Sequence, residues 1–133
     1  MSGKKNSKKQ GALTTNGVVM EAHEYATINI LLKEGIDVEL VEKSRTPHNS
    51  SPDIMMLGMF WEIKSPNGKT TRCVEHALRR ATHQSSNIII DLRRISIADP
   101  TLITFVSKQF FNLRSVRNLW IITKKMEIAK LKK

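Results

Sequence analysis

The apolar run Ile88-Ile89-Ile90 constrains the fold of this chain more than any other feature of its sequence. Three consecutive β-branched residues without polar alternation are typical of a strand that is covered on both faces. Helical patterns lie on either side of this strand, which we place at residues 87–92. One covers residues 71–85, and the other opens at Asp99-Pro100, with Asp99 as the N-cap and Pro100 at the first helical position. The pattern predicts a sheet with helices packed on it.

The remaining patterns extend this alternation. We expect a helix from about residue 18 to 34, ended by Gly35, because six residues share one stripe. These are Val18, Ala22, Tyr25, Ala26, Asn29 and Leu32. Strands are expected at residues 36–40, 53–57, 59–64 and 119–123, and residues 44–52 have the composition of a loop. The order α-β-β-β-α-β-α-β predicts an α/β fold with a mixed sheet flanked by helices.

Composition bounds the domain organisation. With 133 residues the chain suits one domain, which we place at residues 14–123, between a disordered basic arm at 1–13 and a Lys-rich tail at 124–133. The single cysteine, Cys73, excludes an intramolecular disulfide. We expect neither a signal peptide nor a membrane span, because the apolar runs are far shorter than the roughly 20 residues a spanning helix needs.

The charge is unevenly distributed along the chain. The formal net charge is +10, yet residues 12–42 carry a net −5 and residues 43–123 a net +7. A polyanionic partner such as nucleic acid fits this distribution. The two Lys-rich ends are explained equally well as solubilising tails.

Asp53 and Glu62 form the centre of a candidate site. If Leu57-Gly58 is the two-residue loop of a hairpin, the numbers of paired residues sum to 115, and Asp53 lies opposite Glu62. Opposed Cβ atoms in an antiparallel pair are about 5 Å apart. Two carboxylates this close disfavour each other's ionisation, and a divalent cation such as Mg²⁺ relieves the repulsion.

Lys64 lies on the same strand face as Glu62, because residues two apart on a strand point the same way, while Ile63 points into the core. An ammonium beside a metal-binding acid pair can orient water and stabilise charge on a phosphate. The alternative is that Glu62 and Lys64 are a solvent-facing pair and Asp53 a turn residue. A short Asp…Glu-x-Lys string also arises by chance.

The helix at residues 71–85 has a basic face opposite its apolar stripe. The stripe is Val74, Ala77, Leu78 and Ala81, and the opposite face carries Arg72, His76, Arg79, Arg80 and His83. No acid interleaves on that face, so we favour nucleic-acid contact over a solvated surface. Gln84 and Arg93 are further candidates for substrate contact. His48 is a candidate acid or base in the loop, or simply an exposed histidine.

The segment Pro52-Asp53, followed by Glu62-Ile63-Lys64, resembles the signature of the PD-(D/E)XK, restriction-endonuclease-like superfamily of nucleases. The resemblance implies a divalent metal, Mg²⁺ or Mn²⁺ with Zn²⁺ as an option, held by Asp53, Glu62 and the Ile63 backbone carbonyl. Glu24 corresponds to the acid that the first helix contributes in related Holliday-junction resolvases. An ordinary surface glutamate explains Glu24 almost as well, and Glu21 competes for the role.

The stretches WEIKSPNGK and VEHALRRATHQSSNIIIDLRR resemble the C-terminal tRNA-nuclease domain of CdiA-type contact-dependent growth inhibition toxins. That family implies tRNA as substrate, a cognate immunity protein as partner, a cytoplasmic site of action and delivery within a larger toxin. The initial Met fits a stand-alone or isolated domain. Two other hypotheses stay open: a DNA endonuclease or junction-resolvase-like enzyme of a phage or mobile element, and a non-catalytic basic nucleic-acid-binding protein.

Overall fold

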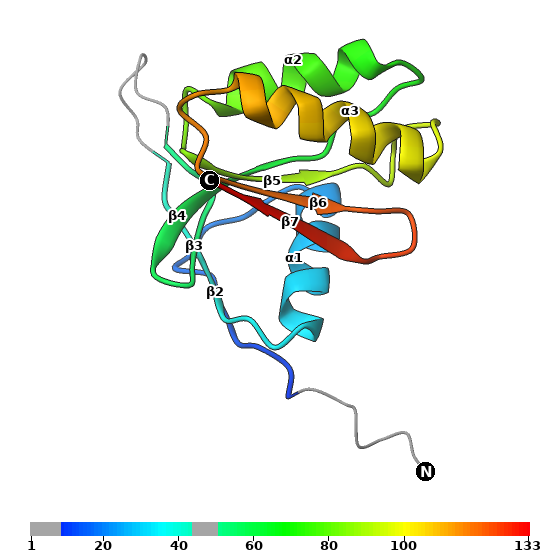
Figure 1. Ribbon diagram of the computed structural model, residues 1–133. Helices are drawn as coiled ribbons and strands as arrows, with labels where there is room; N and C mark the ends of the chain where they lie inside the picture. The colour runs from blue at the N-terminus through cyan, green and yellow to red at the C-terminus, as the bar shows by residue number, and fades with distance from the viewer. Residues whose placement is uncertain (1–8, 44–50) are drawn as a thin grey trace.

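The computed structural model describes residues 9–43 and 51–133, so His48 lies outside the described residues. The described chain folds as one mixed sheet with helices on both faces (Figure 1). The helices are α1 (Ala22–Lys33), α2 (Thr71–Ala81) and α3 (Asp99–Asn112). The strands are β1 (Leu13–Thr14), β2 (Val38–Leu40), β3 (Ile54–Met56), β4 (Met59–Lys64), β5 (Asn87–Asp91), β6 (Asn118–Ile122) and β7 (Ile128–Lys132).

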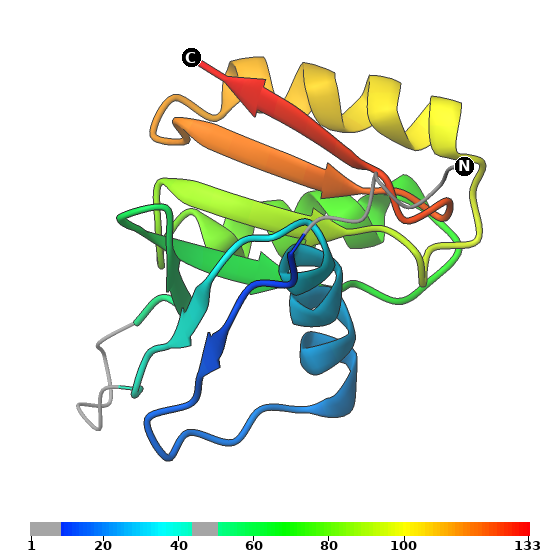
Figure 2. The ribbon, with the colours of Figure 1, turned by 90° about the horizontal axis from the view of Figure 1, so that it is seen from below.

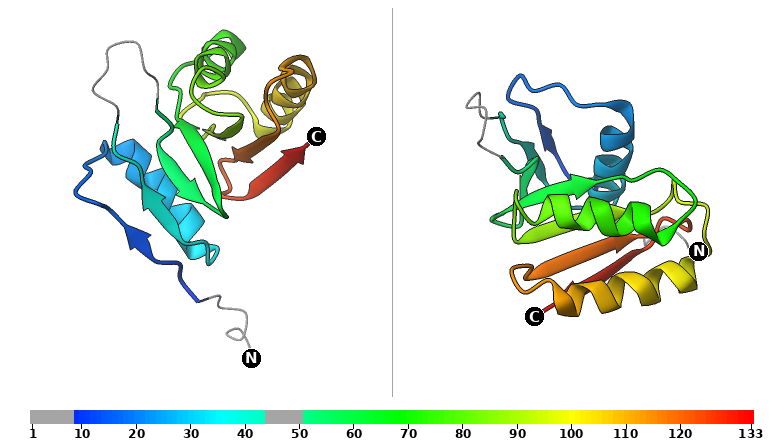
Figure 3. Two further views of the ribbon diagram at one scale, coloured as in Figure 1. Left: turned by 90° about the vertical axis from the view of Figure 1, so that its left-hand side faces the viewer. Right: turned by 90° about the horizontal axis from the view of Figure 1, so that it is seen from above.

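The strands lie side by side in chain order, and their directions make the sheet mixed. β2, β3 and β4 pair antiparallel, whereas β4, β5 and β6 pair parallel through the crossover helices α2 and α3. β1 pairs parallel with β2 at one edge, and β7 pairs antiparallel with β6 at the other (Figure 3). The predicted order α-β-β-β-α-β-α-β is therefore present, with one more strand at each end.

Two apolar cores lie on opposite faces of the sheet. α2 and α3 lie side by side on one face, and α1 covers the other (Figures 1 and 2). β5 supplies both: Ile88 and Ile90 join the core beneath α2 and α3, while Ile89 joins the core beneath α1. This alternation confirms that the apolar run at residues 88–90 is a strand covered on both faces.

α1 begins later than expected and buries a different face. Its N-cap is Glu21, and the buried side chains come mainly from the second half of the helix, including Ile28 and Leu31. Ala26 and Asn29, which belonged to the predicted stripe, are exposed. The stripe was chosen by spacing alone, whereas packing favours the face with the largest apolar side chains. Gly35 follows α1 at φ +85°, as its predicted position requires.

The predicted Lys-rich tail is part of the sheet. Residues 128–132 pair with the whole of β6, and Ile128 and Leu131 pack against the two cores. Lys130 and Lys132 occupy exposed positions of this strand, so the high lysine content concealed an edge strand; the Lys130 ammonium lies over the Trp120 ring, 4.5 Å from its centroid. Charged side chains on an edge strand also oppose pairing with other chains.

The predicted disordered arm also extends too far. The backbone N–H of Gly11 donates to the Leu32 carbonyl at 2.8 Å, and that of Ala12 donates to Asp37 Oδ1 at 2.8 Å. β1 begins at the next residue, Leu13. Gly11 and Ala12 are therefore bonded to α1 and its neighbouring loop, and Leu13 pairs with Val38 of β2. Residues 1–8 lie outside the described part of the chain.

Candidate active site

The β3–β4 hairpin has the predicted register. Ile54 pairs with Trp61 and Met56 with Met59, so paired residue numbers sum to 115. Leu57 and Gly58 form the turn, both with positive φ, as a type I′ turn demands. The ladder begins one residue after Asp53, whose N–H donates to the Trp61 carbonyl at 3.0 Å. The hairpin therefore places Asp53 at its open end. The ladder does not include the predicted pairing of Asp53 with Glu62, but the two carboxylates lie close enough that one ammonium, that of Lys43, lies within 4.0 Å of both.

Asp53 is held to the neighbouring strand by its own carboxylate. Asp53 Oδ2 accepts the backbone N–H of Ile63 at 2.8 Å, and the residue is 4% exposed. Lys64 Nζ lies 3.1 Å from Glu62 Oε2, which confirms that Glu62 and Lys64 share a strand face. Ile63 points to the other side, into the core beneath α1. Hairpin register and strand phase thus bring the three predicted residues together.

Glu62 is an unusual carboxylate because it is buried and incompletely bonded. It is 2% exposed, and among the described buried side chains its Oε1 is the one nitrogen or oxygen atom without a hydrogen-bond partner. Burial raises the pKa of Glu62 from 4.5 to about 7, and the nearby Asp53 charge adds to the rise. Lys64 and Lys43 act in the opposite direction. The site therefore holds an acceptor atom that the protein itself does not satisfy.

Lys43 is a site residue that the sequence did not reveal. It follows β2, and its ammonium lies 2.6 Å from Asp53 Oδ1 and 4.0 Å from Glu62 Oε1. The pairing of Leu40 with Ile54 brings the two chain segments together. Residues 41–53 separate the two strands in the sequence, so no two-residue turn was available from which to count this register. Only the tertiary pairing identifies Lys43.

These residues line one cavity of about 330 Å³ between α1, β4 and α2. Its lining comprises His23, Glu24, Lys43, Asp53, Glu62, Ile63, Lys64, Ser65, Pro66, Ala77, Arg80 and Gln84. The cavity therefore collects every predicted catalytic residue and two of the predicted nucleic-acid contacts, Arg80 and Gln84.

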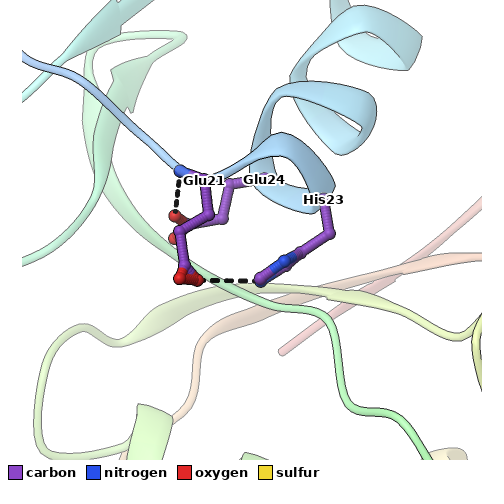
Figure 4. Close-up of side chains that lie close together, drawn as sticks. All are labelled: Glu21, His23 and Glu24. Atoms are coloured by element: carbon purple, nitrogen blue, oxygen red, sulfur yellow. Dashed lines mark hydrogen bonds and ion pairs between the residues drawn. The ribbon is translucent and has the colours of Figure 1, made fainter.

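The first turn of α1 brings Glu24 to the cavity and leaves Glu21 outside its lining. The Glu24 carboxylate also has a structural task, because Oε1 accepts the N–H of Glu21 at 3.0 Å in a capping box (Figure 4). His23 Nε2 lies 3.8 Å from Glu21 Oε1. Glu21, His23 and Glu24 therefore form a small polar cluster at the N-terminus of α1. Both predicted explanations of Glu24, helix residue and cavity residue, describe part of its environment.

The predicted nucleic-acid contacts on and after α2 do not all lie together: some line the acid cavity and others line a second recess. Its apolar stripe is buried as predicted, and Arg80 and Gln84 turn towards the acid cavity. Arg72, His76 and Arg79 line a separate shallow recess with Glu75, and His83 is exposed outside both linings. The expectation that no acid accompanies this face was wrong, because Glu75 Oε2 lies 3.0 Å from Arg79. Residues four apart on a helix are neighbours, and this pair has that spacing.

Arg93 forms an ion pair with the buried Asp91. Its guanidinium donates to both oxygens of Asp91, the shortest contact being 2.8 Å, and Asp91 is 1% exposed. Thr27 of α1 also donates to Asp91, at 2.6 Å. Arg93 therefore neutralises a buried carboxylate outside the acid cavity, which accounts for the residue without any substrate.

The donor set fits a hard divalent cation. Asp53 and Glu62 supply carboxylate oxygens, and Glu62 Oε1 has no hydrogen-bond partner. Ile63, whose backbone carbonyl is the third predicted ligand, lines the same cavity. Mg²⁺ and Mn²⁺ prefer oxygen ligands, whereas Zn²⁺ favours nitrogen and sulfur. The cavity lining contains one histidine, His23, and no cysteine. The residues therefore suit Mg²⁺ or Mn²⁺ better than Zn²⁺.

A buried acid pair on a mixed sheet between helices defines a small α/β domain with a concave polar site. The family model of the contact-dependent growth inhibition CdiA C-terminal domain matches residues 50–128, more than half of the chain. The chain therefore belongs to the CdiA C-terminal domain family. Within the described residues, no helix combines the length and apolarity that crossing a membrane requires.

A solved structure agrees with this fold. The chain is similar to a chain in the CdiA-CT/CdiI toxin and immunity complex from Burkholderia pseudomallei, with a TM-score of 0.65 and 18% identity. The match covers 92% of this chain and 100% of that chain. At this identity the likeness establishes the fold alone. Comparison with curated proteins found no match.

Proposed function

We propose that this domain is a toxin nuclease that hydrolyses phosphodiester bonds with a divalent metal, and that tRNA is its substrate. The observation that carries the proposal is Glu62 Oε1, which has no hydrogen-bond partner and lies buried beside Asp53 in a cavity that two lysines and Arg80 also line. An unsatisfied buried acceptor is costly unless a ligand completes it. The strand order and the set Asp53, Glu62 and Lys64 support placing the domain in the PD-(D/E)XK superfamily.

Each cavity residue has a task in this reaction. Asp53, Glu62 and the Ile63 carbonyl would hold Mg²⁺ or Mn²⁺, which when bound supplies positive charge that polarises a phosphoryl oxygen and acidifies water. The Lys64 ammonium, fixed 3.1 Å from Glu62, can donate to the attacking water or to a phosphate oxygen as charge develops there. Arg80 and Gln84, on the α2 side, can position the phosphate backbone.

The proposed biology follows the family. The structural neighbour is a chain of a toxin and immunity complex. We infer that a cognate immunity protein neutralises this domain, that the domain is delivered as part of a larger toxin, and that it acts in the cytoplasm of the target cell. The preference for tRNA over other nucleic acids comes from the sequence resemblance to tRNA-cleaving members.

The test is a substrate and metal panel. The protein is incubated with tRNA, bulk RNA and plasmid DNA, each with Mg²⁺, Mn²⁺ or EDTA. We expect tRNA cleavage that EDTA abolishes. Nicked plasmid with intact tRNA would indicate the DNA endonuclease alternative, cleavage that survives EDTA would refute the metal, and binding without cleavage of any substrate would favour a non-catalytic protein.

Replacing Lys64 tests the catalytic assignment. Lys64→Ala should lower the cleavage rate by at least about 100-fold, because it removes a preorganised charge from the reacting centre. The fold should persist, since the Lys64 side chain is partly exposed, at 19%, and within the described residues its ammonium forms an ion pair with Glu62 alone. Circular dichroism and initial rates are compared with those of Lys108→Ala, an exposed lysine of α3 outside the cavity lining. Wild-type activity in Lys64→Ala would refute its role.

A further inference from the structure

Lys43 bridges the two acids that the proposed function assigns to the metal. Its ammonium lies 2.6 Å from Asp53 Oδ1 and 4.0 Å from Glu62 Oε1. It also donates to the Ser51 carbonyl at 2.8 Å. The Lys43 ammonium thus contacts both carboxylates, and it does so through Asp53 Oδ1 and Glu62 Oε1.

The remaining carboxylate oxygens have other partners. Asp53 Oδ2 accepts from the Ile63 backbone, and Glu62 Oε2 pairs with Lys64. Asp53 Oδ1 accepts from Lys43, and Glu62 Oε1 has no partner within hydrogen-bond distance. A cation that binds both acids through these two oxygens approaches the same atoms that face the Lys43 ammonium.

The two lysines differ in how firmly the protein holds them. The side chain of Lys64 is 19% exposed, whereas that of Lys43 is 47% exposed. An ammonium near solvent regains its hydration when it leaves a carboxylate, so its departure costs less than that of an enclosed one. The Lys43 ammonium can therefore move away from the carboxylates at a lower cost than the Lys64 ammonium.

We propose that Lys43 is a placeholder cation: its ammonium neutralises Asp53 and Glu62 in the metal-free protein and competes directly with the divalent cation for them. This inference rests on the proposed function, since it takes the acid pair to be the metal site. Competition makes metal binding weaker than the acids alone would support. In the metal-free protein Lys43 compensates the buried Asp53 carboxylate, while Lys64 pairs with Glu62. Lys43 therefore sets the metal affinity of this domain.

The experiment measures binding of Mn²⁺ alone, by calorimetry, without any nucleic acid. Lys43→Met should bind Mn²⁺ about tenfold more tightly than the wild type, which corresponds to about 1.4 kcal/mol. Lys43→Arg keeps the charge and should remain within about threefold of the wild type. Lys108→Met, which removes the same charge from α3, should also stay within about threefold. Lys43→Gln repeats the measurement with a polar side chain in case Lys43→Met folds poorly.

Thermal unfolding supplies a second readout. In EDTA, Lys43→Met should melt below the wild type because the acid pair loses its counter-ion, and saturating Mn²⁺ should close that gap. Unchanged or weaker Mn²⁺ binding by the neutral Lys43 variants overturns the inference while the metal site itself stands. A gain of the same size in Lys108→Met overturns it as well, because net charge would explain the effect. If neither the wild type nor Lys43→Met binds Mn²⁺, the metal-dependent function falls too.

Discussion

Glu62 combines two properties that a folded protein rarely allows in one side chain. It is 2% exposed, and one of its oxygens has no partner. Burying an ionised carboxylate without full compensation is costly, and the usual response is a raised pKa. Such a residue lowers the stability of the protein and is most easily understood as part of a binding or catalytic site.

The raised pKa predicts a pH dependence of stability. Glu62 has a pKa of about 7 in the folded protein and an ordinary value of 4.5 when unfolded. Between these values the folded state binds the proton more tightly, so metal-free stability falls as the pH rises from about 4.5 to 7. Relative to Glu62→Gln, the wild type should lose up to about 3 kcal/mol across this window, each pKa unit being about 1.4 kcal/mol.

Urea unfolding in EDTA at pH 5, 6, 7 and 8 measures this difference. Other groups titrate in both proteins, and subtracting the two curves removes their contribution. A difference between wild type and Glu62→Gln that does not change with pH would show that Glu62 ionises normally.

At the scale of elements, the β3–β4 hairpin decides the geometry of the acid pair. Leu57 occupies the first turn position at φ +54°, a conformation that a leucine adopts at a cost, and its side chain is 58% exposed. Asn-Gly is the preferred sequence for a type I′ turn. The strained residue is therefore a place where stability can be gained without touching the site.

Leu57→Asn should stabilise the protein by about 0.5–1 kcal/mol, because asparagine tolerates positive φ better than leucine does. Gly58→Ala, at φ +75°, is the opposing control and should destabilise by about 1 kcal/mol. Chemical denaturation measures both changes. Destabilisation by Leu57→Asn would mean that the Leu57 side chain contributes packing that outweighs its backbone strain.

The basic face of α2 leads to a second prediction at this scale. Arg80 lines the acid cavity, whereas Arg79 pairs with Glu75 outside it. In a Lys64→Ala background, Arg80→Ala should weaken tRNA binding about tenfold, and Arg79→Ala by less than about threefold, because its charge is already compensated. Filter binding at one fixed salt concentration compares them. Equal losses would place the substrate along the whole helix face.

At the scale of the whole molecule, the last strand completes both cores. β7 covers the edge of β6, and its apolar residues Ile128 and Leu131 pack on opposite faces of the sheet. A terminal segment that only solubilised the chain could be removed without effect. The packing here argues otherwise.

Removing residues 128–133 should lower the melting temperature by more than about 10 °C or abolish cooperative unfolding, because it exposes β6 and opens both cores. The control is Lys132→Ala at an exposed position of the same strand, which should change stability by less than about 0.5 kcal/mol. Calorimetric scans decide the matter. A truncated protein that melts like the wild type would restore the interpretation of this segment as a tail.

Local sequence determined much of this protein. A two-residue turn fixes hairpin register, so the proximity of Asp53 and Glu62 followed from counting, and strand periodicity placed Lys64 beside Glu62. The apolar stripe of α2 and the buried strand at residues 88–90 followed from periodicity in the same way. These features depend on neighbours a few residues apart, and such relations can be read directly from a sequence.

The tertiary structure alone decided the rest. Lys43 reaches the acids because β2 pairs with β3, and residues 128–132 become β7 because β6 offers them an edge. α1 buries the side chains that meet the sheet, whichever stripe its spacing favours. Each outcome is a competition between distant surfaces for apolar burial and charge compensation, and no local pattern encodes which partner wins.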